Sequence, residues 1–189
     1  MTLKVVHIIT GLGDGGAEGV LFRLVSASAG RCDNIVVSLT DLGKYGSKFN
    51  DLGINVVCLG MNRGRLNIKS LYSLYKVIKR LQPDVVQTWM HHADLLGGIA
   101  SYLCGVKSIF WNVRTAELHS QKVKFGTRLV IKVCSMLSKY IPTEIISCSH
   151  RAIEVCLSLG YANKFQLIPN GCDTSQFIKS ESHRKESRS

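Results

Sequence analysis

Short apolar runs recur along the chain, each bounded by glycine, proline or aspartate and each followed by a stretch with a different periodicity. Continuous runs of this length, rich in β-branched residues, are typical of strands that are buried on both faces of a parallel sheet. We therefore expect about seven strands. The runs are LKVVHIIT, NIVVSL, INVVCL, DVVQTW, SIFWNV, EIISCS and FQLI.

The stretches between these runs carry apolar residues three or four positions apart, which is the spacing of an amphipathic helix. Helices are predicted from Ala17 onward and over residues 71–81, 96–103, 127–140 and 150–159. Strands that alternate with helices predict an α/β fold. We expect a doubly wound, mostly parallel sheet of about seven strands with right-handed crossovers.

The apolar pattern ends at Phe177, and residues 178–189 contain a single hydrophobic side chain. A chain of 189 residues is long enough for one sizeable core and too short for two full α/β domains. A content of 46% hydrophobic and 20% charged residues argues against a disordered protein. The expected organisation is one domain over residues 1–177 and a polar tail over residues 178–189.

A glycine-rich segment, HIITGLGDGGAEGVL, joins the first predicted strand to the first predicted helix. Gly11, Gly13 and Gly16 spell the G-x-G-x-x-G pattern of dinucleotide sites, while the adjacent pair Gly15-Gly16 allows a different phosphate ligand. In both cases the turn lies at the carboxyl edge of the sheet, where backbone amides and the helix dipole favour an anion. The alternative that remains open is a tight turn with no ligand.

Two further features belong to the dinucleotide alternative, which would make the protein an NAD(P)-dependent oxidoreductase. Asp41 follows the second strand, where an acidic residue would bind the ribose. Tyr72 and Lys76 resemble the Y-x-x-x-K catalytic pair of short-chain dehydrogenases, but they precede the fourth strand, which is too early in the chain for that family. A surface pair one helical turn apart is the simpler interpretation.

Five segments in order, GLGDGGAEGVL, SLTDLGKYGSKFNDLGINVVCLGM, PDVVQTWMHHADLLGG, IFWNVRT and IPNGCDTSQF, resemble the N-terminal half of family 4 glycosyltransferases. The resemblance implies one Rossmann-like half of a GT-B fold, on the acceptor side of a retaining enzyme of polysaccharide or lipopolysaccharide synthesis. It also implies that the donor-binding domain is missing and that the isolated chain is inactive. The sequence departs from the family at Gly19, where arginine or lysine is common, and at Cys172, where an apolar residue is common.

The resemblance implies roles for six residues. The Gly15 and Gly16 amides would face the diphosphate of a nucleotide sugar, UDP or GDP, and His92 would contact the transferring sugar. Arg114 would hold a phosphate of the donor or the acceptor, and the Asn170-Gly171 turn would lead into the donor domain. The acceptor would be the hydroxyl of a glycan or of a lipid-linked sugar. No permanently bound cofactor is expected.

Simpler structural interpretations of the same residues remain open. His92, or its neighbour His91, could be a solvated or helix-capping histidine, and Arg114 could pair with Glu117 or Asp94. Asp94 is better explained as a first-turn acid that the helix dipole favours. Two adjacent histidines and seven cysteines without a C-x-x-C give no metal-binding geometry, so no metal is expected. A non-catalytic binding fragment is the second alternative function.

The formal net charge of +11 is high, and the cations gather on two predicted helices. Solvated helix faces are one explanation, and a peripheral site on an anionic membrane is the other. Nucleic acid is not expected as a partner, because the aromatic residues lie within strands and helices rather than among the cations. With no signal peptide and no long apolar segment, we expect a cytoplasmic protein, and under the second explanation its peripheral site would be the inner face of the membrane. The clustered cations are Lys69, Lys76, Lys79 and Arg80, and Lys122, Lys124, Arg128, Lys132 and Lys139.

Overall fold

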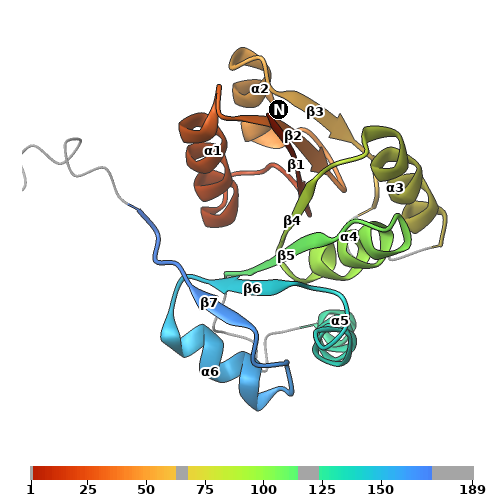
Figure 1. Ribbon diagram of the computed structural model, residues 1–189, viewed down its shortest axis with the longest axis vertical. Helices are drawn as coiled ribbons and strands as arrows, with labels where there is room; N and C mark the ends of the chain where they lie inside the picture. Colours follow the sequence, from red (N-terminus) through yellow and green to blue (C-terminus); the bar gives the residue numbers. More distant parts are fainter. Residues whose placement is uncertain (1, 63–67, 115–123, 172–189) are drawn as a thin grey trace, which may run out of the picture.

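The computed structural model describes residues 2–62, 68–114 and 124–171. Over these residues it contains one sheet of seven strands, all parallel, in the order β3-β2-β1-β4-β5-β6-β7. The predicted doubly wound α/β fold is confirmed, and each apolar run supplies one strand (Figure 1). The strands are β1 (Leu3–Ile9), β2 (Cys32–Ser38), β3 (Asn55–Cys58), β4 (Val85–Trp89), β5 (Ser108–Val113), β6 (Glu144–Ser147) and β7 (Phe165–Leu167).

All five predicted helices are present, and one further helix was not predicted. The helix expected at 127–140 begins two residues earlier and ends three residues earlier. The additional helix, α2, contains two glycines, and its anchor is Phe49, which is fully buried against Phe22. The helices are α1 (Gly16–Ser28), α2 (Gly43–Asp51), α3 (Ile68–Leu81), α4 (His91–Leu103), α5 (Phe125–Leu137) and α6 (His150–Ser158).

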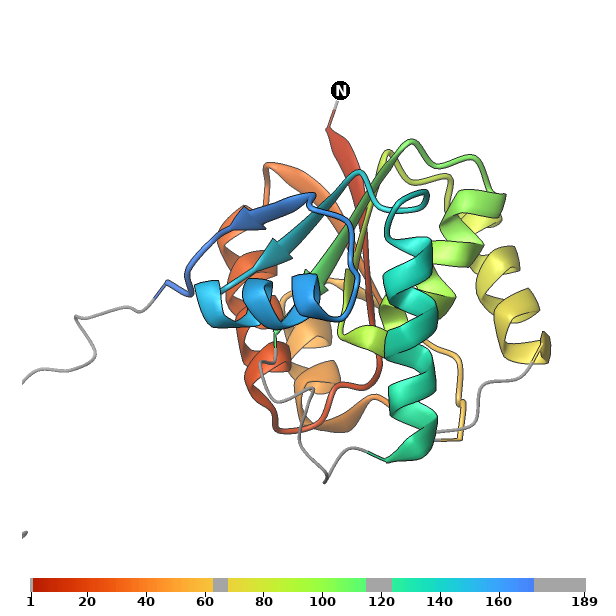
Figure 2. The same ribbon diagram turned by 90° about the horizontal axis from the view of Figure 1, so that it is seen from below.

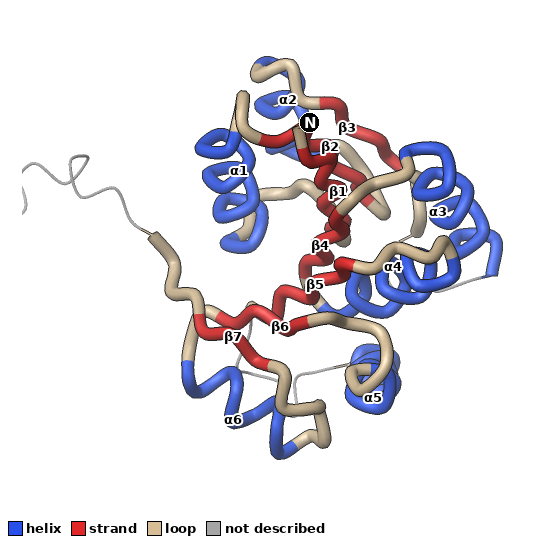
Figure 3. The backbone as a smooth tube through the Cα atoms, in the orientation of Figure 1, coloured by secondary structure: helices blue, strands red, loops and turns tan. Residues whose placement is uncertain are grey.

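The sheet is covered unequally on its two faces. Helices α3, α4, α5 and α6 pack on one face, where they form two continuous apolar clusters with alternate residues of the strands. Helices α1 and α2 pack on the other face, over β1, β2 and β4 (Figures 1 and 3). Because β1 and β4 are neighbours and the strand order reverses between them, the carboxyl edge at this point is where α/β folds bind ligands.

Helix α4 lies very close to the sheet because of two adjacent glycines. A Cβ added at Gly97 would lie 2.8 Å from a methyl carbon of Thr88, and one added at Gly98 would lie 2.8 Å from the indole nitrogen of Trp111. Side chains at these positions would push the helix outward, since real Cβ atoms do not approach neighbours this closely. The two glycines therefore fix where the first turn of α4 meets the carboxyl edge.

Candidate active site at the carboxyl edge of the sheet

The predicted glycine loop lies between the end of β1 and the start of α1, at the carboxyl edge. Gly15 is the N-cap residue of α1, with extended φ and ψ of −132° and 165°, and it has no side chain to cap the helix. A Cβ at Gly15 would lie 2.9 Å from the carboxyl carbon of Glu18, so only glycine lets Glu18 fold back over the loop. No side chain of the N-cap residue binds the first amides of α1, but the Glu18 carboxylate lies beside the N-cap and competes with an anion there.

A cavity of about 400 Å³ opens beside this loop and is lined by residues from five separate segments of the chain. It adjoins a larger cavity of about 620 Å³, which lies along α1 over the uncovered part of the sheet and is also lined by Arg114 and Asn170. Gly171 lines the larger cavity. The smaller cavity, which we name the glycine-loop cavity, is lined by Gly15, Gly16, Ala17, Glu18, Val20, Met90, His91, Arg114, Cys148 and Asn170.

Arg114 follows β5 and is held in place on three sides. Its Nε donates a hydrogen bond to Oδ1 of Asn112 at 2.8 Å, and its Nη1 donates to Oδ1 of Asn170. The guanidinium also lies 5.0 Å from the centre of the Trp89 ring. Partial burial lowers the pKa of Arg114 from its ordinary value, but the group stays charged. A guanidinium fixed in this way is preorganised to bind an anion in the cavity.

The alternative that Arg114 pairs with a carboxylate is not supported for Asp94. Asp94 lies on the opposite side of β4, where its Oδ1 accepts a 2.6 Å hydrogen bond from Oγ1 of Thr88. Glu117, the other candidate partner, lies outside the described residues, as does Cys172. The structure brings Arg114 and Asn170 into contact at this edge, and the roles expected of them stay predictions.

The two adjacent histidines face different cavities. Met90 has a φ of 72°, a left-handed value that is uncommon for a residue other than glycine, and it turns the chain into α4. His91 is buried and lines the glycine-loop cavity, whereas His92 is half-buried and lines a cavity of about 490 Å³ between α4 and α5. The sequence placed His92 in the same crevice as the glycines. In the structure His91 occupies that place, and no feature of the sequence distinguishes one histidine from the other.

His91 and Asp94 form a buried pair in the first turn of α4. Nδ1 of His91 lies 4.0 Å from Oδ2 of Asp94, and the Asp94 side chain is fully buried. Burial raises the pKa of Asp94 to about 7. Burial, together with the nearby charge of His92, lowers the pKa of His91 to about 4. At neutral pH His91 is therefore uncharged, and a neutral imidazole can accept a hydrogen bond as well as donate one.

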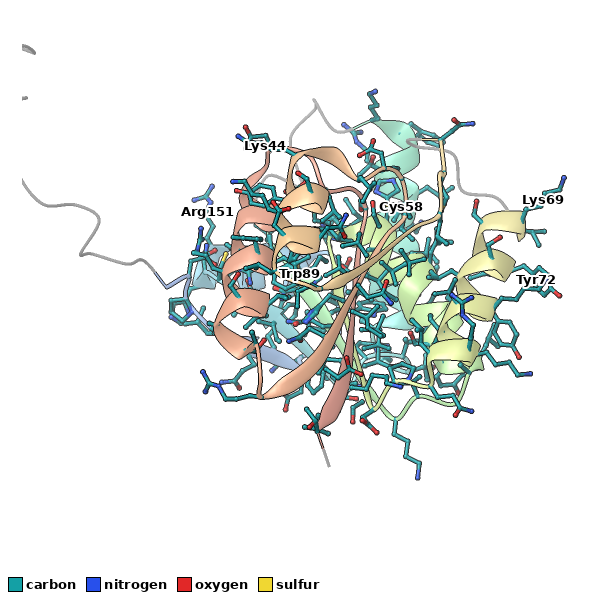
Figure 4. All side chains as sticks on the ribbon, turned by 90° about the horizontal axis from the view of Figure 1, so that it is seen from above. Lys44, Cys58, Lys69, Tyr72, Trp89 and Arg151 are labelled. Atoms are coloured by element: carbon teal, nitrogen blue, oxygen red, sulfur yellow. The ribbon has the colours of Figure 1, made fainter. Side chains whose placement is uncertain are left out.

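The residues of the dinucleotide alternative lie away from the glycine-loop cavity. Tyr72 is 55% exposed on the outer face of α3, with Nζ of Lys76 4.4 Å from its ring centre, which confirms the surface-pair interpretation. Figure 4 shows Tyr72 pointing away from the sheet, far from Trp89. Asp41 is exposed and lies near Cys58, at the β3 end of the edge.

Within residues 2–62, 68–114 and 124–171, no group of three or more histidine, cysteine, aspartate or glutamate side chains is placed to hold a metal ion. In the same ranges no helix combines the length and apolarity needed to cross a bilayer.

Residues 14–176 match the model of the family described as Glycosyltransferase Family 4. The chain belongs to this family. It is also 33% identical over 113 residues to an Escherichia coli protein, the UDP-Gal:alpha-D-GlcNAc-diphosphoundecaprenol alpha-1,3-galactosyltransferase, in a match that covers 59% of this chain and 29% of that protein. The predicted family resemblance is thus confirmed. The segment that matches the family model, residues 14–176, includes the glycine pair, Arg114 and Asn170.

Solved structures show the same fold. HepE from Anabaena, in complex with UDP-glucose, superposes with a TM-score of 0.79 at 18% identity, over 98% of this chain and 49% of HepE. The lipopolysaccharide outer core galactosyltransferase WaaB superposes with a TM-score of 0.62 at 15% identity, over 90% of this chain and 46% of WaaB. The family 4 domain is therefore the Rossmann-like half of a GT-B fold, and it spans about half the length of these structures.

Proposed function

We propose that this family 4 domain is the acceptor side of an enzyme that transfers a sugar from a nucleotide-sugar donor to a hydroxyl, with retention of configuration. The observation that carries the proposal is the glycine-loop cavity, in which Gly15, Gly16, Arg114 and Asn170 meet. These residues come from three loops at one edge of the sheet. Together they offer backbone amides, the positive end of a helix and a fixed guanidinium to one anion.

The chemistry of this cavity suits a diphosphate that becomes a leaving group. As the bond to the sugar breaks, negative charge grows on the diphosphate, and groups already aimed at it stabilise that charge without further reorganisation. Glu18 lies at the same loop and opposes the anion, so Arg114 is the group we expect to decide binding. His91, uncharged and at the wall of the cavity, is placed to accept a hydrogen bond from a sugar hydroxyl, and His92 faces the neighbouring cavity.

The proposal also names the donor nucleotide, UDP or GDP, and the acceptor, a glycan or a lipid-linked sugar. The solved relative HepE is described in complex with UDP-glucose, and the E. coli relative is named for UDP-Gal and a diphosphoundecaprenol acceptor. We propose a uridine nucleotide as donor and a lipid-linked sugar as acceptor, with the Asn170-Gly171 turn leading toward the donor-binding part. The enzyme would then act at the cytoplasmic face of a membrane.

Calorimetric titration of the chain with UDP, GDP and NAD tests the proposal. We expect the nucleoside diphosphates to bind more tightly than NAD. Arg114→Gln should weaken diphosphate binding about tenfold, because it removes a charge-assisted hydrogen-bond donor from the cavity. Arg31→Gln is the matched control, since Arg31 donates to the carbonyl of Ala27 at the far end of α1. NAD as the tightest ligand, or equal losses in the two variants, would contradict the proposal.

A further inference from the structure

Helix α5 exposes a row of large apolar side chains to solvent. Phe125 is 83% exposed, Leu129 55% and Met136 56%, and Tyr140, just beyond the helix, is 73% exposed. Positions separated by three, four or seven residues share one side of a helix, so the three helical residues form one stripe. The opposite side of α5, with Val130 and Cys134, is buried against the sheet.

Cations flank this stripe, and α5 itself contains no acidic residue. At about 100° per residue, Lys132 and Arg128 follow one border of the stripe, with Lys132 directly beside it. Lys124 and Lys139 are exposed residues just beyond the two ends of the helix. A helix with an exposed apolar stripe and a basic border is typical of segments that lie in the plane of an anionic bilayer surface.

Helix α3 is the other basic surface, and its aromatic residues are arranged differently. Nζ of Lys76 lies 4.4 Å from the ring centre of Tyr72, and Nζ of Lys79 lies 5.5 Å from that of Tyr75. The lysines of α3 therefore cover its own rings. In the described part of the chain no cation lies over Phe125 or Tyr140, so the apolar surface of α5 is open to a partner.

The stripe lies beside a cavity at the carboxyl edge. Helices α4 and α5 start at this edge, the same edge as the glycine loop (Figure 2). The cavity of about 490 Å³ between them has walls formed by Leu95, Leu129, Val130 and Val133, with Lys124 and His92 at its polar end. A lipid-linked molecule held in a bilayer under α5 would therefore meet an apolar groove and one cation before it reached the histidine.

We propose that the outer face of α5 is the surface by which this domain docks on an anionic membrane. The proposal deepens the proposed function, because it names the side from which a lipid-linked acceptor enters. The apolar stripe inserts among the acyl chains, while Lys124, Arg128, Lys132 and Lys139 bind lipid phosphates.

Co-sedimentation with vesicles tests the docking surface without donor or acceptor. Vesicles of phosphatidylglycerol and phosphatidylethanolamine in equal amounts should bind the chain, with binding that weakens as salt is added, and pure phosphatidylcholine vesicles should not. The variant Phe125→Ser/Leu129→Ser should bind at least about tenfold more weakly, which corresponds to about 1.4 kcal/mol. Its matched control is Ile68→Ser/Tyr72→Ser on α3, which removes similarly exposed apolar side chains and should bind like the wild type.

A second pair of variants tests the contribution of charge separately. It keeps the proposal testable if the variants of the first pair do not fold. Lys132→Gln/Lys139→Gln should weaken binding about tenfold, and Lys76→Gln/Lys79→Gln should change it little. No binding by the wild type, or equal effects of the α3 and α5 variants, would overturn the proposal. Because no nucleotide is present, a failed titration with UDP would contradict the proposed function and leave this result unaffected.

Discussion

The variant Gly43→Ala should lower the free energy of unfolding by about 3 kcal/mol, because two costs fall on one position. Gly43 opens α2 with a φ of 46°, which a residue with a Cβ rarely adopts. The added Cβ would also lie 2.7 Å from the amide nitrogen of Gly13 and would overlap the carbonyl of Leu12. Both neighbours are backbone atoms of the glycine loop, so they cannot move aside as a flexible side chain can.

The same substitution should also weaken diphosphate binding, because the carbonyl of Leu12 anchors the loop by accepting a 2.9 Å hydrogen bond from the amide of Tyr45. Urea unfolding and calorimetry measure the two effects. Gly53→Ala is the matched control: its φ is 72°, but no atom lies within 4 Å of the added Cβ, so it should cost only the backbone strain of about 1 kcal/mol. Equal losses in the two variants would show that the contact with the loop is unimportant.

The free energy of unfolding of Asp94→Asn, measured relative to that of the wild type, should rise by about 2–3 kcal/mol between pH 5 and pH 8. The folded pKa of Asp94 is raised to about 7, from an ordinary value of 3.8, by burial. The folded state therefore binds more protons than the unfolded state between these two values, and stability falls as the pH rises through this window. An amide keeps the shape and the bond to Thr88 but does not ionise.

Two buried histidines act in the opposite direction. The pKa values of His7 and His91 are lowered to about 4, mainly by burial, so their contribution to stability is lost as the pH falls from 6.5 toward 4. Urea unfolding from pH 5 to pH 8 separates the two effects, since the histidine effect remains in Asp94→Asn. Asp51→Asn, on the exposed end of α2, is the control for the general effect of replacing a carboxylate by an amide. A profile of Asp94→Asn identical to that of the wild type would contradict the assignment.

The sequence by itself determined the sheet and the loops at its carboxyl edge. Continuous apolar runs can be buried only where both faces of a sheet are covered, and parallel strands place all their C-terminal loops at one edge. For this reason Gly15, Gly16 and Arg114 could be expected at one edge before their contacts were known, whereas Asn170 was expected only as part of an interdomain turn. Their roles in binding and transfer remain predictions.

The tertiary structure alone decided which polar groups are buried and which apolar groups are exposed. Helix α2 has weak propensity and exists because Phe49 packs into the core, which is a contact between distant segments. The choice between His91 and His92 depended on the rotation of α4, which the close contact of Gly97 and Gly98 with the sheet sets. The burial of Asp94 and the exposure of Phe125 also depend on how the helices pack on the sheet. The pattern of apolar and polar residues in the sequence specifies only the period of each helix.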